Sequence, residues 1–180
     1  MGKVFAELND DLRAFIAEQH LFFVATAPLS ADGHINLSPK GLDSFRILGP
    51  MTVAYLDLTG SGVETIAHLR ENGRLTVMFC AFQGRPRIVR IQGRGRVVMP
   101  IDAEWAELSA GFLPMPGVRS VIVLEADRIS DSCGYGVPLY EFAGHRKQLT
   151  EWAVKKGPDG VEEYKAKKNA TSIDGLPGLV

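Results

Sequence analysis

A glycine-rich segment with three hydroxyl side chains is the first candidate for chemistry in this sequence. Thr59, Ser61 and Thr65 lie around two glycines, where an apolar run ends and a helix-like pattern begins. Free backbone N–H groups at the start of a helix, with Ser and Thr hydroxyls beside them, suit a phosphate group. Ser61 and Glu64 also have the spacing of a capping box, so an ordinary capped helix accounts for the same residues.

An arginine-rich run without any acidic residue is the second candidate. Its members are Arg85, Arg87, Arg90, Arg94 and Arg96. In an extended strand, Arg90 falls on the face opposite Val89 and Ile91. This cationic face can present Arg90 to an anion, line a subunit interface or simply face solvent.

Lys40 is the third candidate. It follows Ser38 where the chain leaves a predicted strand, so its ammonium group can meet a ligand held at the strand end. A lone lysine in a loop is also an ordinary surface residue. No side chain stands out as a catalytic acid or base. His34, Tyr55 and Asp57 can reach such a pocket, but each also suits a plain role in solvent or in the core.

Several common kinds of site are excluded by residue spacing. The four histidines are scattered, and no Cys-x-x-Cys pair occurs. The chain also lacks a Gly-x-Ser-x-Gly elbow, a Walker A loop and a dinucleotide fingerprint. We therefore expect no metal site.

The composition is that of an ordinary globular domain. The 180 residues include 20 Lys and Arg against 21 Asp and Glu, and 46% are hydrophobic. A net charge of −1 argues against nucleic acid or an acidic membrane as a partner. Two cysteines cannot build a disulfide framework, and no apolar run reaches the roughly 20 residues of a membrane span. Because the first residues are also unlike a signal peptide, we expect a single cytoplasmic domain over residues 1–180.

The elements that must position these residues are mostly strands. Strands are expected over His20–Ala27, His34–Ser38, Thr52–Leu58, Arg74–Phe82, Arg87–Met99 and from Ser120 onward. Helices are expected over Glu7–Gln19, 61–72, Asp102–Gly111 and in two tail pieces, the first from Gly144, separated at Gly157-Pro158. The stretch Pro39–Pro50 is expected to be a loop. Six strands without regular βαβ alternation predict a mainly β, α+β fold, a small closed or split antiparallel barrel.

In this order, the segments resemble the pyridoxamine 5′-phosphate oxidase-like family of FMN-binding split barrels. The matching segments are FFVATA (22–27), GHINLSPKG (33–41), TVAYLDLTGSGVETIAHLRENGR (52–74), LTVMFCAF (75–82) and PRIVRIQGRGRVV (86–98). The resemblance covers a split-barrel core over residues 5–135. Residues 136–180 are then a C-terminal helical extension, which looks like that of one branch of the family.

The resemblance implies a six-stranded barrel that forms a homodimer and binds FMN between its subunits. It also implies an FMN-dependent oxidoreductase that transfers a hydride or electrons between a small-molecule substrate or donor and the flavin. Lys40 would lie near the pyrimidine end of the ring, and Arg90 would pair with the phosphate. The residues that the resemblance assigns to the cofactor are Ser38, Lys40, Tyr55, Asp57, Thr59, Ser61, Thr65 and Arg90.

The chain departs from the family pattern at the cofactor and at the substrate. A phosphate-binding lysine of the true oxidases falls on Thr65, and a glutamine falls on Ile88. The C-terminal Trp, Arg and His pattern with which the true oxidases bind their substrate is not visible in the tail. These departures argue against pyridoxamine phosphate as the substrate. Three alternatives stay open: a flavin- or haem-binding carrier or sensor without turnover, a deazaflavin in place of FMN, and a dimer whose groove binds another anion.

Overall fold

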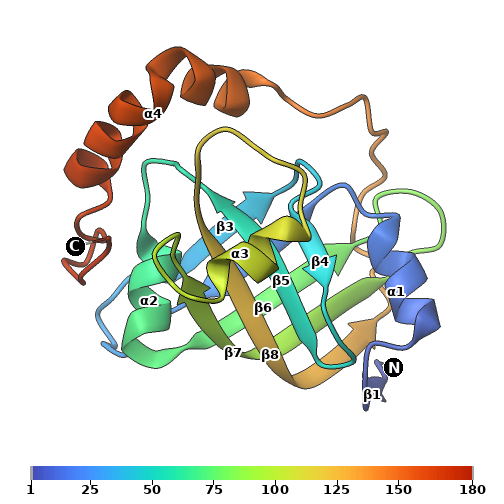
Figure 1. The fold of residues 1–180 in the computed structure, drawn as a ribbon. Helices are drawn as coiled ribbons and strands as arrows, with labels where there is room; N and C mark the ends of the chain where they lie inside the picture. The colour runs from blue at the N-terminus through green and yellow to red at the C-terminus, as the bar shows by residue number, and fades with distance from the viewer. Residues whose placement is uncertain (1, 180) are drawn as a thin grey trace.

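The computed structural model describes residues 2–179, which fold into one curled antiparallel sheet with helices around it (Figure 1). The strands are β1 (Val4–Phe5), β2 (Phe22–Thr26), β3 (Asn36–Lys40), β4 (Phe45–Ile47), β5 (Thr52–Leu58), β6 (Arg74–Cys80), β7 (Ile88–Val98) and β8 (Val118–Ser132). Seven strands follow the order β3-β2-β6-β7-β8-β5-β4, and β1 pairs with β8 outside this path. Within residues 2–179 the end strands β3 and β4 do not pair with each other, so the barrel is split.

The expected fold class is confirmed, but six strands were too few. The loop expected over Pro39–Pro50 contains β4, which at three residues is too short to show an alternating pattern. The strand expected over His34–Ser38 lies instead at Asn36–Lys40, because it continues through Pro39. A proline is tolerated there because β3 is the edge of the sheet and pairs only with β2.

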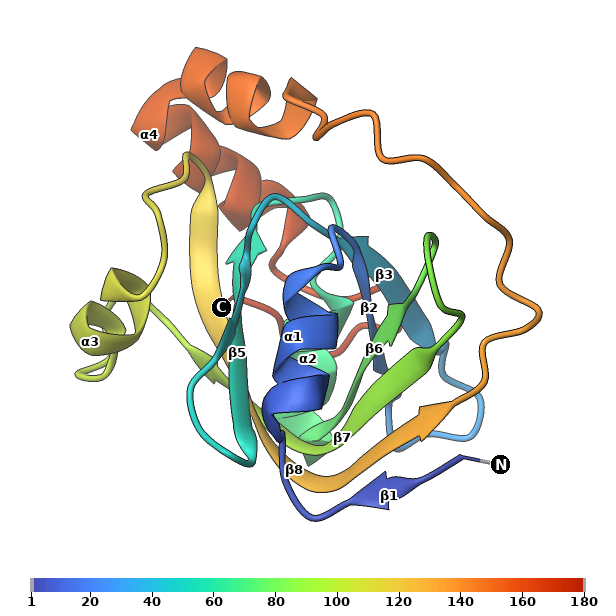
Figure 2. The ribbon, with the colours of Figure 1, turned by 90° about the vertical axis from the view of Figure 1, so that its right-hand side faces the viewer.

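The curled sheet closes around a core of apolar side chains, to which α1 (Asp10–Ala17) contributes. The carboxamide of Asn9 caps this helix by accepting from the Leu12 N–H, and Leu12 and Ile16 are buried in the core. Figure 2 shows α1 between β5 on one side and β2 and β6 on the other. The fifteen-residue β8 pairs with β7, β5 and β1, so it ties the sheet together.

The helix α2 (Glu64–Asn72) ends where the sequence predicts, but its first residues are capped in another way than expected. Gly73 terminates it in the left-handed conformation, with φ 69°. Its N-cap is Val63, which makes no side-chain capping bond. The Glu64 carboxylate accepts from the Ile173 N–H instead. The predicted capping box of Ser61 and Glu64 is therefore wrong.

The C-terminal extension crosses the outside of the barrel and returns to α2 (Figures 1 and 2). It contains α4 (Gln148–Lys168), which starts four residues later than expected and is broken at Gly157, with φ 70°, as predicted. Residues 169–179 then reach α2, where Arg70 donates to the Gly178 carbonyl. The short α3 (Trp105–Ala110) packs Trp105 against a second, smaller apolar cluster. No described helix is both long and apolar enough to cross a membrane.

Candidate functional site

A buried ionic cluster of three side chains lies where β3, β5 and β8 come together. Asp57 of β5 is fully buried, and its carboxylate accepts from Lys40 Nζ at 3.2 Å. The guanidinium of Arg119, on β8, donates to both carboxylate oxygens of Asp57. Ser120 Oγ adds a further bond to Asp57, at 3.3 Å. Asp57 pairs with Ser120 in the β5–β8 ladder and Leu58 pairs with Val118, so Arg119 is the extra residue of a β-bulge. A bulge changes the direction of a side chain, and here it lets both Arg119 and Ser120 reach Asp57.

The cluster carries a surplus positive charge, because Lys40 and Arg119 share the single carboxylate of Asp57. Burial alone would raise the pKa of Asp57, but the two cations outweigh it and hold this pKa below its usual value. Asp57 therefore stays ionised, and the three groups sum to one positive charge in a largely buried place. A buried excess charge of this kind favours a negatively charged ligand.

Arg119 also connects the cluster to the glycine-rich loop. Its Nη1 donates to the Gly62 carbonyl at 2.8 Å and to the Asn169 side chain at 2.9 Å. Arg119 is not among the predicted site residues, because the last strand was expected to begin one residue later, at Ser120. A single arginine beside an uninterrupted apolar run is the signal that could have identified it.

Two buried hydroxyl groups beside the cluster have no partner among the described residues. They are Thr59 Oγ1, directly after β5, and the Tyr55 phenol in β5. Burial, and then the neighbouring Asp57 charge, raises the pKa of Tyr55 well above its usual value, so the phenol keeps its proton. Buried donors normally have an acceptor. Two orphaned hydroxyls next to a surplus positive charge fit an anionic ligand rich in oxygen acceptors.

The predicted residues Ser38 and Thr65 belong to a neighbouring hydrogen-bonded chain. Ser38 Oγ donates to Asn36 Oδ1, and Asn36 Nδ2 donates to Thr65 Oγ1, each at 3.0 Å. The same Nδ2 also donates to Thr26 Oγ1, which bonds the buried His68 ring. This chain fixes β3, and hence Lys40 at its end, against β2 and α2.

The other two predicted residues, Ser61 and Arg90, do not join the cluster. The side chain of Ser61 is exposed on the loop. Arg90 donates to Ser132 Oγ at 3.1 Å and pairs with Ser130 in the β7–β8 ladder. Because Ser130 lies ten residues along β8 from Ser120, about 30 Å of strand separates Arg90 from Asp57. The alternation of side chains along a strand predicted on which face of β7 Arg90 lies, but it could not predict how far Arg90 is from Asp57.

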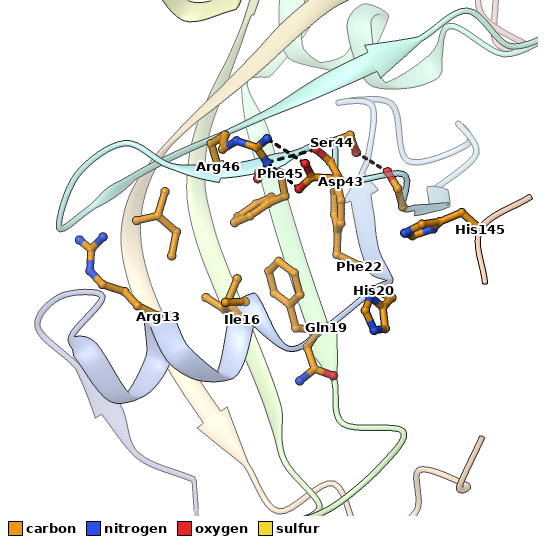
Figure 3. Close-up of a pocket in the computed structure, with 14 residues that line it drawn as sticks. Arg13, Ile16, Gln19, His20, Phe22, Asp43, Ser44, Phe45, Arg46 and His145 are labelled. Atoms are coloured by element: carbon orange, nitrogen blue, oxygen red, sulfur yellow. Dashed lines mark hydrogen bonds and ion pairs between the residues drawn. The ribbon is translucent and has the colours of Figure 1, made fainter. Parts of the chain in front are cut away.

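A separate hollow of about 300 Å³ begins at Gly41, the residue after Lys40 (Figure 3). Phenylalanine side chains, among them Phe22 and Phe45 with ring centroids 5.2 Å apart, line its base. His20 and His145 lie together at one end of it. The hollow therefore combines an aromatic surface with polar and charged side chains, and Gly41 connects it directly to Lys40 in the chain. Within residues 2–179, no group of three His, Cys, Asp or Glu side chains is arranged to hold a metal ion.

Known proteins are similar to this chain in both sequence and fold. The pyridoxamine 5′-phosphate oxidase family profile matches residues 8–133. The pyridoxamine 5′-phosphate oxidase family protein ustO of Aspergillus flavus is 42% identical over 194 aligned residues, which cover 97% of this chain and 77% of that protein.

Two solved structures have the same fold at low sequence identity. A variant of HupZ from Group A Streptococcus has a TM-score of 0.55 and 23% identity, over 69% of this chain and 99% of that chain. The FAD binding protein from Mycobacterium smegmatis has a TM-score of 0.50 and 16% identity, over 72% and 96%. At these identities the structures establish the shared barrel.

Proposed function

Because the chain belongs to the pyridoxamine 5′-phosphate oxidase family, we propose that it is a flavoprotein that binds FMN beside the Lys40–Asp57–Arg119 cluster and acts as an oxidoreductase on a small molecule. The observation that carries the proposal is the surplus positive charge of this cluster, with its two orphaned hydroxyls. The phosphate of FMN is an anion, and charge-assisted hydrogen bonds are the strong contacts for such a group. The proposal therefore places the phosphate at the cluster, with Lys40 as its contact, and not at Arg90, where the resemblance had put it. A flavin-binding protein with the same barrel further supports a flavin.

Each residue of the cluster has a distinct part in this proposal. The Lys40 side chain is 20% exposed, whereas that of Arg119 is 4% exposed, so Lys40 is the cation that a ligand can reach. Asp57 orients the Lys40 ammonium, and Arg119 compensates the charge of Asp57 from the other side. Thr59 supplies a hydroxyl donor. When bound, FMN would supply the hydride or electron transfer, while the chain supplies orientation and charge.

The hollow next to Gly41 supports a small, partly aromatic substrate. Its volume lies at the lower end of the range for ligand pockets, about 300–1,000 Å³. Both arginines that line it already have partners: Arg46 donates to Asp43 and to the Gly111 carbonyl, and Arg13 donates to the Leu8 and Gly49 carbonyls. The hollow therefore does not need an anionic substrate. Pyridoxamine phosphate is not the substrate we propose, since the tail lacks the Trp, Arg and His pattern with which the true oxidases bind their substrate.

We also propose that the protein works as a homodimer. Leu37 on the edge strand β3 is 64% exposed, and Ile35 just before it is 77% exposed. An edge strand with exposed apolar side chains invites pairing, and a second copy of the chain would cover it. A cytoplasmic location and the absence of nucleic-acid and membrane partners remain predictions from composition.

A flavin carrier or sensor without turnover is the second candidate. It is favoured by the bonding of the cluster, in which Lys40, Asp57 and Arg119 are engaged with one another. That arrangement leaves no free acid or base among these three side chains.

The visible absorption spectrum of the purified protein, with and without added FMN and after desalting, tests the proposal. We expect a retained two-band flavin spectrum that NADH or NADPH bleaches under anaerobic conditions. A retained spectrum that neither nucleotide bleaches would favour the carrier, and a Soret band would favour haem. A protein that stays colourless after desalting would contradict the proposal.

A further inference from the structure

One residue of the C-terminal extension is built into the candidate site. Asn169 follows α4 and is fully buried. Its N–H donates to the Lys165 carbonyl, and its own carbonyl accepts from the Leu179 N–H, both at 2.8 Å. The end of α4 and the end of the tail therefore both hold Asn169 in place.

The carboxamide of Asn169 joins Arg119 to the glycine-rich loop. Its Oδ1 accepts from Arg119 Nη1 at 2.9 Å, and its Nδ2 donates to the Gly60 carbonyl at 3.0 Å and the Ser61 carbonyl at 3.4 Å. The reversed amide would place its NH₂ group against the guanidinium and its oxygen against two carbonyls. Only the observed orientation satisfies every partner.

We propose that Asn169 is a positioning residue for the flavin site. It holds the Arg119 guanidinium in place between Asp57 and the loop, and it ties the Gly60 and Ser61 carbonyls into the protein. The C-terminal extension thereby supports Arg119 and the glycine-rich loop of the site. This inference rests on the proposed binding of FMN next to Asp57.

The neutrality of the amide matters as much as its shape. Arg119 needs an acceptor at this position, and a carboxylate oxygen could accept this one bond as well as the amide oxygen does. A second carboxylate would, however, cancel the surplus charge of the Lys40–Asp57–Arg119 cluster, and it would lose the two bonds that Nδ2 donates to the Gly60 and Ser61 carbonyls. An amide accepts from Arg119 and leaves the charge available to an anion.

Asn169→Asp separates this role from a merely structural one, because the two side chains have nearly the same shape. We expect the affinity for FMN to fall at least tenfold. The affinity for riboflavin, which lacks the phosphate, should fall less than threefold. A fluorescence titration with each flavin measures both values, and a general loosening of the fold would weaken both ligands alike.

Asn169→Ala provides a second readout that needs no flavin. Without the carboxamide, amide hydrogen exchange in the flavin-free protein should quicken over residues 59–66 and stay unchanged over 22–26 in β2. Ser172→Ala is the matched control, since among residues 2–179 the Ser172 hydroxyl bonds to the Leu176 N–H alone, within the tail. That control should leave loop exchange unchanged and FMN affinity within twofold of wild type.

The outcomes distinguish this inference from the proposed function. If wild type binds FMN, but Asn169→Asp keeps the wild-type ratio of FMN to riboflavin affinity and Asn169→Ala keeps the wild-type exchange, the inference alone is overturned. If wild type binds no flavin, the proposed function is wrong and the assignment of Asn169 to a flavin site falls with it.

Discussion

Replacing Asp57 with asparagine should destabilise the protein strongly. Asparagine has nearly the same shape but no charge, so Lys40 and Arg119 would repel each other without a carboxylate between them. Removing one partner of a buried ion pair costs about 3–5 kcal/mol. Since the asparagine oxygen can still accept one bond and Lys40 is partly exposed, we expect the lower end of this range, about 3 kcal/mol. In urea, with a slope of about 2 kcal/mol/M, the unfolding midpoint would fall by about 1.5 M.

Two further variants check the reasoning behind this magnitude. Among the residues that the structure describes, Arg119 is bonded to Asp57, to Gly62 and to Asn169, whereas the Lys40 ammonium is bonded to Asp57 alone. Arg119→Met should therefore cost about 3 kcal/mol or more. Lys40→Met should cost about 1 kcal/mol or less. The reasoning would be refuted if Asp57→Asn costs under 1 kcal/mol, or if Lys40→Met costs as much as Arg119→Met.

Acid unfolding gives an independent check on the same carboxylate. Burial would raise the pKa of Asp57, but Lys40 and Arg119 outweigh it and lower the pKa. A carboxyl whose pKa is lowered by folding stabilises the protein above its unfolded pKa, near 3.9, and this stability is lost as the pH falls through the folded value. The urea midpoint of wild type should thus fall more steeply below about pH 4 than that of Asp57→Asn. Parallel pH profiles would contradict this.

Two other changes test the barrel and the tail. A Cβ at Gly93 would lie 2.0 Å from the Glu125 carbonyl, so Gly93→Ala should disrupt the β7–β8 bulge and cost about 2 kcal/mol or more, whereas Gly136→Ala meets only open space and should stay within about 0.5 kcal/mol. Equal thermal midpoints for these two variants would contradict the close approach. Asp174 accepts from the N–H and the ring of His34, so Asp174→Asn should quicken amide exchange over residues 170–179, and unchanged exchange would show that this contact does not anchor the tail.

The elements with strong local patterns could be predicted from the sequence. The alternating apolar run gave β5 its observed bounds, Thr52–Leu58, and Gly73 and Gly157 interrupt helices where expected. The missed strands, β1 and β4, have two and three residues, which is too few for any periodicity. Their pairing is decided by the strands that they lie beside.

Single residues of the site could be predicted from the sequence, but the contacts between them could not. Lys40 and Asp57 were each candidates, but their pairing across seventeen residues depends on how β3 and β5 approach in space. Thr65 was expected to face a phosphate, and its hydroxyl accepts from Asn36, a contact for which the sequence holds no local signal. Arg90 was expected at the same phosphate, and the ladder places it far along the barrel. Asn169 had no local signal, since its role exists only once the tail has returned to the loop.

A titration of FMN into wild type, Lys40→Met and Lys155→Met tests the central claim most directly. Lys155 is exposed on α4, so its replacement removes the same charge away from the cluster. We predict that wild type binds FMN, that Lys40→Met weakens binding at least tenfold, and that Lys155→Met leaves it within twofold of wild type. No binding by wild type, or equal affinity in all three proteins, would contradict a flavin site at the Lys40–Asp57–Arg119 cluster.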